Sequence, residues 1–239
     1  MKMDGKRVLV TGASRGIGEG IARHFQQRGA CVYGTATSKP DKDLGFVSEW
    51  FETDFSDPDS LSQFCTTLRE MKGFDVCVNN AGINIIKPVD LIESEDYSKI
   101  QKINLEAPYK IIKSLVPGMR TMGGGKIINV ASIWSTISKT YRSLYSTTKA
   151  GLVGMTKAMA VEFAKDNILV NAISPGFTMT DLTKKSLSEE QMDELANTVP
   201  LGRFAKVDEI AQVILFLASD HNTYLTGQNI VVDGGFTIV

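Results

Sequence analysis

Short apolar runs alternate with amphipathic segments of helical spacing from one end of the chain to the other. The runs that predict strands are 7–11, 31–35, 50–53, 74–78, 126–130, 168–173 and 228–232. The segments that predict helices are 16–28, 57–72, 94–116, 144–164 and 208–218. Such alternation is typical of a parallel sheet with helices on both faces. Right-handed crossovers make this sheet doubly wound. We therefore expect a single α/β domain over residues 1–239, with about seven strands.

One stretch, residues 177–202, departs from this alternation. It is polar, it carries one short predicted helix at 189–196, and it ends shortly after Pro200. We interpret this stretch as a lid.

Local signals refine two of the predicted helices. Asp57 is a suitable N-cap because Pro58 follows it at the first helical position. Pro108 lies inside the long helix 94–116 and should bend it, since proline cannot donate a helical hydrogen bond.

Composition excludes several classes of function. With 26 basic and 27 acidic residues among 239, the chain has no basic footprint for nucleic acid or an anionic membrane. Its three cysteines are widely spaced and it has two histidines, which argues against a metal site or a disulfide framework. We expect buried, reduced thiols. No signal-peptide core is present, and the longest apolar stretch, 210–218, is far shorter than the ~20 residues that cross a bilayer. These features predict a cytoplasmic protein.

A glycine-rich turn joins the first predicted strand to the first predicted helix. Gly12, Gly16 and Gly18 follow the spacing G-x-x-x-G-x-G, which differs from the commoner G-x-G-x-x-G fingerprint. The glycines permit a tight turn and let backbone N–H groups approach a pyrophosphate, and the helix N-terminus favours negative charge. The strand–loop–helix context favours a dinucleotide site of the Rossmann type over a merely tight turn.

The end of the second predicted strand bears on the choice of dinucleotide. An acidic residue there binds a ribose 2′-hydroxyl and repels a 2′-phosphate. Thr37, Ser38 and Lys39 stand there instead, and Arg15 reaches from the glycine loop. Hydroxyls and cations suit a phosphate, so we expect NADPH. NADH use stays open, because a neutral polar turn tolerates both cofactors.

Tyr145 and Lys149 lie four residues apart and therefore share one face of a predicted helix. Ser132 lies thirteen residues before Tyr145. A free phenol titrates near pH ~10, and a neighbouring cation lowers its pKa toward the range of acid–base catalysis. An isolated pair of this kind is more often a solvated surface pair. The rest of the chain therefore has to decide between the two interpretations.

Taken together, these features resemble the short-chain dehydrogenase/reductase family over the whole chain. TGASRGIG at 11–18, NNAG at 79–82 and YSTTK at 145–149 are similar to motifs of that family. The resemblance implies a catalytic tetrad of Asn104, Ser132, Tyr145 and Lys149, without a metal. The cofactor contacts it implies are Gly12, Ser14, Arg15, Gly16, Ile17, Gly18, Thr37, Ser38, Asp54, Phe55, Asn80, Ala81, Gly82, Tyr145, Lys149, Pro175, Gly176, Thr178 and Thr180.

Within the family, the chain is most similar in appearance to the 3-oxoacyl-[acyl-carrier-protein] reductases. The similarity lies in GTATS at 34–38, FLASD at 216–220 and YLTGQ at 224–228. It implies NADPH as cofactor, a homotetramer, and an acyl thioester as one alternative for the small-molecule carbonyl substrate. That subgroup docks its acidic carrier on two arginines, whereas this chain has glycines at 123–125 and Lys165–Asp166 in their places. The missing arginines remove electrostatic steering and argue against a carrier protein as partner.

The resemblance also implies a mechanism. Tyr145 donates the proton to the developing alkoxide, and Ser132 donates a second hydrogen bond to the same oxygen. Lys149 lowers the tyrosine pKa and holds the nicotinamide ribose. Asn104 kinks the long helix and anchors a water that links Lys149 to solvent.

The substrate pocket is expected to be bordered by Ser132, Trp134, Arg142, Tyr145 and Phe177. Arg142 and Trp134 suit a planar, polar or anionic group such as a carboxylate or a sugar. The alternative is a surface arginine stacked on an aromatic ring. We favour a small polar ketone over a long acyl chain. A cofactor-sensing scaffold on the same fold fits less well, because all four catalytic positions are filled.

Overall fold

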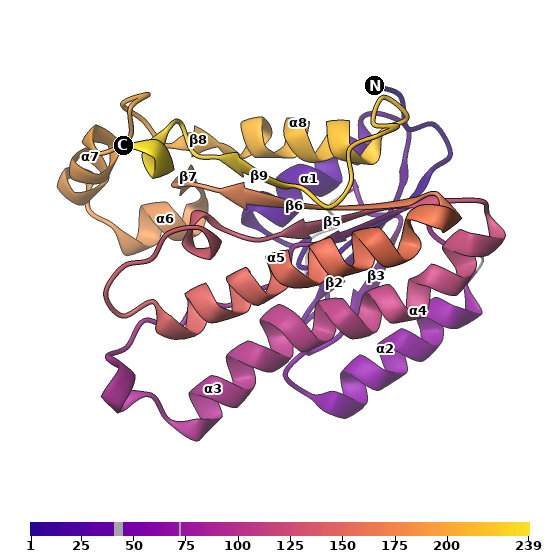
Figure 1. Cartoon of the computed structure of the whole chain (residues 1–239), viewed down its shortest axis with the longest axis horizontal. Helices are drawn as coiled ribbons and strands as arrows, with labels where there is room; N and C mark the ends of the chain where they lie inside the picture. Colours follow the sequence, from indigo (N-terminus) through magenta and orange to yellow (C-terminus); the bar gives the residue numbers. More distant parts are fainter. Residues whose placement is uncertain (41–44, 72) are drawn as a thin grey trace.

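A seven-stranded, wholly parallel sheet forms the centre of the protein (Figure 1). The computed structural model describes residues 1–40, 45–71 and 73–239. Within these ranges the strands of the sheet are β1 (Arg7–Val10), β2 (Cys31–Ala36), β3 (Glu49–Glu52), β4 (Val76–Asn79), β5 (Gly125–Val130), β6 (Ile168–Pro175) and β9 (Asn229–Val232). Their order is β3-β2-β1-β4-β5-β6-β9. This is the predicted doubly wound, Rossmann-type arrangement.

The strand order creates a crevice above the centre of the sheet. From β1 the chain moves outward to β2 and β3, and then returns to β4 on the other side of β1. The loops that follow β1 and β4 therefore diverge at the carboxyl edge of the sheet, which is where doubly wound proteins bind ligands. The C-terminus lies at this edge with the helices α6 (Asp181–Ser186) and α7 (Glu189–Asn197), on the left of Figure 1.

Helices cover both faces of the sheet. The helices α1 (Gly16–Gln26) and α8 (Val207–Ala218) pack together on one face, over a core that includes Ile21, Phe25 and Ile214. The other face is covered by α2 (Pro58–Glu70), α4 (Ala107–Thr121) and α5 (Ser143–Phe163) (Figure 1). All eight residues of β6 are buried, as expected for a strand with helices on both sides.

The predicted long helix is interrupted at Asn104 and not at Pro108. It consists of α3 (Ser94–Gln101), a π-helical segment (Lys102–Glu106) and α4, which continues through Pro117 to Thr121. Pro108 occupies the first turn of α4, where proline is tolerated. Because Pro108 has no N–H, it releases the backbone carbonyl of Asn104 from the helical ladder. The π-helical interruption therefore lies one turn before Pro108.

Most other predicted boundaries agree with the structure within two residues. The carboxylate of Asp57 accepts a hydrogen bond from the N–H of Asp59, which confirms it as the N-cap of α2. Lys72, where the prediction ended that helix, lies outside the described residues. Cys65 and Cys77 are buried, but Cys31 is partly exposed, so the expectation of buried thiols is wrong for Cys31.

The stretch 177–202 contains more regular structure than the single predicted helix. It starts with the short strand β7 (Thr178–Met179), which pairs with β8 (Ala205–Lys206), and it contains both α6 and α7. Thr180 caps α6 by accepting a hydrogen bond from the N–H of Thr183. Its action as a lid stays a prediction. No helix in the described part of the chain is long and apolar enough to cross a membrane.

Candidate active site at the carboxyl edge of the sheet

The glycine loop after β1 is held in a shape that excludes side chains. Gly12 and Gly16 have φ angles of +65° and +58°, in the left-handed region that favours glycine. A Cβ atom on Gly18 would lie 2.1 Å from the carbonyl oxygen of Gly12. The loop therefore offers an open backbone cradle in front of the N-terminus of α1, as a pyrophosphate site requires.

The loop is fixed to its neighbours by residues whose structural role the sequence motifs did not reveal. The hydroxyl of Thr11 accepts hydrogen bonds from the N–H groups of Asn80 and Ala81, each at 3.0 Å. The Asn80 side chain donates in return to the carbonyls of Thr11 and Gly12, at 3.0 and 3.1 Å. The hydroxyl of Thr35 accepts from the N–H of Gly12. The amide of Asn80 is thus occupied in holding the loop.

Three of the residues that are expected to contact the cofactor are exposed to solvent around this loop. Arg15 is exposed in front of α1, and Thr37 and Ser38 are exposed after β2. Glu52, from the end of β3, accepts a hydrogen bond from the N–H of Lys39 at 3.3 Å. An acidic side chain therefore stands beside this turn, although it comes from a different strand. The sequence analysis missed it because the register of β2 with β3, which pairs Ala36 with Glu52, cannot be read from β2 alone.

Asp54 and Phe55 are adjacent in the sequence but differ in their exposure to solvent. Asp54 is exposed, and its carboxylate accepts hydrogen bonds from the N–H and the hydroxyl of Ser56. These bonds lower the pKa of Asp54. The ring of Phe55 is buried in the core against Phe64, with ring centroids 6.0 Å apart. Any contact of Phe55 with a cofactor would therefore involve its backbone.

Ser132, Tyr145 and Lys149 come together at the start of α5. Ser132 follows β5 and donates a hydrogen bond to the phenol oxygen of Tyr145. The Lys149 ammonium lies 5.6 Å from the centroid of the Tyr145 ring and donates to the carbonyl of Val130 at 2.7 Å. Lys149 is buried, and burial lowers its pKa to about 8. The predicted serine–tyrosine–lysine group is therefore assembled in space.

The pKa of Tyr145 departs from the expectation. It is raised above its usual value because the phenol is withdrawn from water, and this outweighs the hydrogen bond from Ser132 and the positive charge of Arg142, which both lower it. The expectation that Lys149 lowers this pKa is wrong for the present geometry. The ammonium is directed to the carbonyl of Val130, and burial dominates at the phenol.

Asn104 joins this group through its side chain. Its Oδ1 accepts from the N–H of Ile83, and its Nδ2 donates to the carbonyl of Ile83, both at 2.9 Å. The same Nδ2 donates to the hydroxyl of Thr148 at 3.1 Å, and that hydroxyl donates to the carbonyl of Tyr145. A Cβ atom on Gly82 would lie 3.3 Å from Oδ1 of Asn104 and 3.5 Å from Nζ of Lys149. Asn104 therefore ties the loop after β4 to the start of α5.

The segment after β6 reaches back over the glycine loop. Gly176 approaches the backbone of Asp233 so closely that a Cβ atom would lie 2.8 Å from its Cα. The hydroxyl of Thr178 donates to the carbonyl of Gly176. A Cβ on Gly16 would meet the methyl group of Thr180 at 3.7 Å. The segment 175–180 and the glycine loop are thus neighbours at the carboxyl edge of the sheet.

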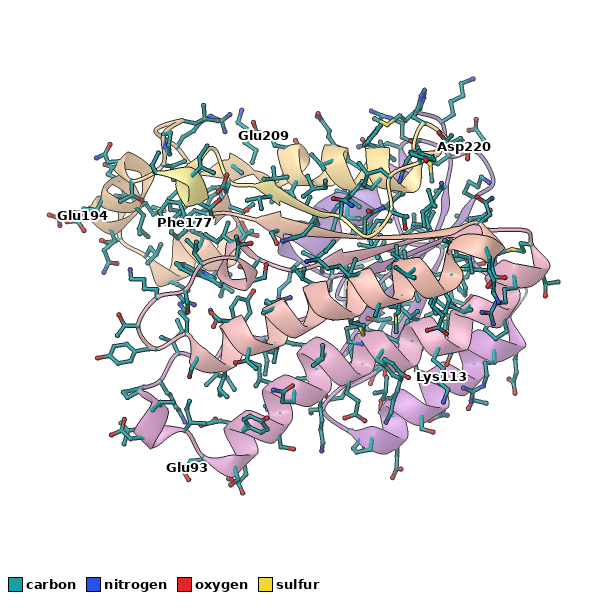
Figure 2. The ribbon with its side chains drawn as sticks, in the orientation of Figure 1. Glu93, Lys113, Phe177, Glu194, Glu209 and Asp220 are labelled. Atoms are coloured by element: carbon teal, nitrogen blue, oxygen red, sulfur yellow. The ribbon has the colours of Figure 1, made fainter. Side chains whose placement is uncertain are left out.

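The expected substrate residues form one aromatic cluster with Arg142. The Trp134 ring contacts Phe177, with centroids 6.5 Å apart, and the Arg142 guanidinium carbon lies 5.4 Å from the Trp134 centroid. Figure 2 shows Phe177 at the same end of the molecule as α6 and α7. Phe204 and Phe236 complete the cluster, at 5.5 and 5.0 Å from Phe177. The sequence analysis missed both of them, since no motif marks either residue.

One of the two places without the expected arginines takes part in a local ion pair. Asp166 accepts a hydrogen bond from Nε of Arg120 at 2.6 Å. The guanidinium of Arg120 also lies 5.7 Å from the centroid of the Phe163 ring. The charge of Arg120 is therefore paired within the chain, whereas the neighbouring Lys165 is exposed.

Comparisons with known proteins agree with this architecture. A family model described as enoyl-(acyl carrier protein) reductase matches residues 12–237. The chain is 38% identical over 245 residues to a 3-oxoacyl-[acyl-carrier-protein] reductase of Vibrio cholerae, with all of both chains covered.

Solved structures give the same result at lower identity. A putative NAD(P)-dependent gluconate 5-dehydrogenase from Beutenbergia cavernae, with bound NADP, superimposes with a TM-score of 0.93 at 29% identity, covering 100% of this chain and 99% of the other. The L-sorbose reductase of Gluconobacter frateurii, solved with NADPH and L-sorbose, gives 0.90 at 32% identity, covering 98% and 97%. Sequence motifs, sheet topology and these similarities together establish that the chain is an oxidoreductase of the short-chain dehydrogenase/reductase family.

Proposed function

We propose that this protein is an NADPH-dependent reductase that converts a substrate carbonyl to an alcohol, with Tyr145 as the proton donor. The observation that carries the proposal is the assembly of a hydrogen-bonded Ser132–Tyr145 pair beside the buried Lys149, in the crevice that the glycine loop also faces. Residues for acid catalysis and for phosphate binding thus lie at one edge of the sheet.

The crevice has the features that a dinucleotide needs. The close approach of Gly18 to Gly12 leaves free backbone at the N-terminus of α1, where a pyrophosphate is favoured. Arg15, Thr37 and Ser38 are exposed and available to a 2′-phosphate, which supports NADPH over NADH. When bound, NADPH supplies the hydride for the reduction.

Residues of the protein itself donate the proton and bind the carbonyl oxygen. The raised pKa keeps Tyr145 protonated at neutral pH, which is the form that reduction requires. The Ser132 hydroxyl can donate to the carbonyl oxygen as negative charge develops there. Lys149 is protonated below about pH 8, and its ammonium faces the same space as Gly82. Asn104 positions the start of α5 through Thr148.

Two classes of substrate follow from the comparisons and the site. The first is a 3-oxoacyl thioester, supported by the similarity to the carrier-protein reductases. The second is a small polar or sugar-like keto compound, and a specific observation favours it. Where the carrier-docking arginines are expected, the chain has glycines at 123–125 and Lys165–Asp166, and Asp166 pairs with Arg120, so the arginine pair that would steer an acidic carrier is missing.

Replacement of Tyr145 by Phe tests the acid assignment. The variant should lose NADPH oxidation by about 10²- to 10⁴-fold for every ketone that the wild type reduces, because only the proton donor is removed. The dissociation constant for NADPH, measured by fluorescence titration, should stay near the wild-type value. A Tyr145→Phe enzyme that keeps its turnover would show that another group donates the proton.

The homotetramer stays a prediction. Exposed apolar side chains on α5 and near the C-terminus support it, since Val161, Tyr224, Ile238 and Val239 are each more than four-fifths exposed. The alternative of a cofactor-sensing scaffold predicts that no ketone is reduced under any condition.

A further inference from the structure

Arg142 occupies a strained turn directly in front of the catalytic helix. It lies three residues before Tyr145, with φ −105° and ψ 7°, in the bridge region between strand and helix conformations. The preceding residue, Tyr141, has a φ angle of +67°, which bulky L residues avoid. Strain of this kind persists where the surrounding structure holds it, and it often marks a functional segment. The turn therefore fixes the position of the Arg142 backbone, to which the side chain is attached.

The Arg142 guanidinium rests on a rigid platform. Its carbon atom lies 5.4 Å from the centroid of the Trp134 ring, which is buried. Phe177 and Phe236, whose ring centroids lie 5.0 Å apart, both meet that ring edge-on, at 6.5 and 6.4 Å. A guanidinium stacked on an aromatic face keeps its N–H donors free in its own plane. The contact with Trp134 thus leaves the five N–H donors of the planar Arg142 guanidinium free to bind a ligand.

Within the described residues, no acidic side chain pairs with this cation. The Arg142 guanidinium forms no hydrogen bond and no ion pair there, whereas Arg120 and Arg203 each bind a carboxylate. Arg142 is half-buried, and the loss of water lowers its pKa, although arginine stays charged. A partly dehydrated charge without a partner is costly, and a bound anion would relieve that cost.

The same cation lies near the proposed reaction centre. Arg142 is the N-cap of α5, three residues before Tyr145, and its positive charge lowers the pKa of that phenol. A substrate whose carbonyl oxygen meets Tyr145 and Ser132 would extend its neighbouring atoms toward Arg142. We propose that Arg142 binds a carboxylate of the substrate, so that the protein acts on keto acids and hydroxy acids. This inference rests on the proposed function and deepens it.

A carboxylate fits better than the phosphate of a thioester carrier. Arg142 lies within one helical turn of Tyr145, so its ligand must be close to the reacting carbonyl. In a 3-oxoacyl thioester the phosphate is separated from the ketone by the whole pantetheine arm. A planar guanidinium also matches a carboxylate through two parallel hydrogen bonds.

A matched pair of substrates tests the inference. 5-Keto-D-gluconate and L-sorbose share one carbon skeleton, and they differ by a carboxylate in place of a CH₂OH group. The Arg142→Gln variant should lower kcat/KM for 5-keto-D-gluconate by about 10- to 100-fold, the cost of a lost charged hydrogen bond, and change the value for L-sorbose by less than about 3-fold. Arg142→Lys should fall between, because an ammonium keeps the charge but not the planar fork.

Arg7 provides a matched control. It is also stacked on aromatic rings, 5.1 Å from Tyr33 and 4.9 Å from Phe74, but it begins β1 at the opposite edge of the sheet. Arg7→Gln should leave the ratio of the two substrates unchanged. An equal loss on both substrates in Arg142→Gln would overturn the inference and leave Arg142 as a support for Trp134. A loss confined to acetoacetyl-CoA, and absent for acetoacetyl-N-acetylcysteamine, would assign the anion to a carrier phosphate and overturn it as well.

A measurement without turnover separates this inference from the proposed function. L-Tartrate and L-threitol form a second matched pair, in which the carboxylates are replaced by CH₂OH groups. At constant ionic strength and with NADP⁺ present, tartrate should raise the Tm of the wild type and of Arg7→Gln, but not of Arg142→Gln, while threitol should raise none. If no ketone is reduced but this pattern holds, the proposed function fails and the carboxylate site stands. If ketones are reduced but tartrate has no effect on the wild type, the carboxylate site fails alone.

Discussion

The two halves of the candidate site are built in different ways. The cofactor half consists of loops that follow β1, β2 and β4, and backbone atoms and short hydroxyl side chains hold it together, as in the contacts of Thr11 with Asn80 and Ala81. The substrate half consists of large side chains from distant parts of the chain, with Trp134, Arg142, Phe177 and Phe236 in one cluster. The first half depends on the absence of side chains, and the second depends on their packing.

This difference predicts which kind of substitution should damage each half. A backbone cradle tolerates no added atoms, so small substitutions should abolish it. An aromatic cluster shares its contacts among several rings, so the loss of one ring should weaken substrate binding and leave the cofactor site intact. Substitutions in each half test this contrast.

Gly18→Ala should be the most damaging change. The added Cβ would lie 2.1 Å from the carbonyl oxygen of Gly12 and 2.4 Å from Nδ2 of Asn80, so the loop must move. A displacement of this size should weaken NADPH binding by about 100-fold, measured by fluorescence titration.

Gly154→Ala is the matched control for that substitution. Gly154 is an exposed position in α5, and a Cβ there meets nothing within 4 Å. Alanine should stabilise the helix by about 0.5–1 kcal/mol, seen as a higher Tm, with unchanged NADPH affinity. Normal NADPH binding by Gly18→Ala would refute the steric account of the loop.

Phe236→Ala should damage the substrate half alone. Phe236 contacts Trp134 and Phe177 edge-on, and its removal should raise KM for the ketone about 5- to 10-fold, with the affinity for NADPH unchanged. Ile238→Ala, at an 85% exposed position in the same C-terminal turn, should leave KM unchanged. A loss of NADPH affinity in Phe236→Ala would show that the two halves are not independent.

The smallest effect is expected at the rim of the cofactor half. Thr37→Asp places an acid where a 2′-phosphate is expected and should shift the ratio of kcat/KM from NADPH toward NADH by about 5-fold, the size of an exposed charge effect. Glu52→Gln removes the acid beside Lys39 and should shift the same ratio toward NADPH by about 2-fold. An unchanged ratio in Thr37→Asp would indicate that Arg15 alone recognises the 2′-phosphate.

Sequence analysis predicted the fold well because its signals are local. Strands and helices follow from apolar periodicity, and Asp57 and Pro58 together specify the start of α2. Its errors arose where an effect acts at a distance along the chain. Pro108 affects the helix at Asn104, four residues earlier, and the strands β7 and β8 are two residues each and depend on pairing with one another.

The candidate site shows the same division. Spacing placed Tyr145 and Lys149 on one helix face, the motifs along the whole chain favoured catalysis over a surface pair, and the glycine pattern predicted the loop. The pKa of Tyr145 could not be predicted in this way, because it is a balance between burial, Ser132 and Arg142 that depends on three-dimensional surroundings. Phe204, Phe236 and Glu52 reach the site from elements that no motif marks.

The pattern along the chain was therefore enough to predict the order of strands and helices, the glycine loop and the spacing of the candidate catalytic residues, since these depend on backbone geometry within a few residues. The direction of the Tyr145 pKa shift, the aromatic contact of Arg142 and, among the described residues, the lack of a carboxylate beside that cation follow only from the three-dimensional arrangement. Those properties depend on which distant side chains exclude water and supply charge, and folding alone brings such side chains together.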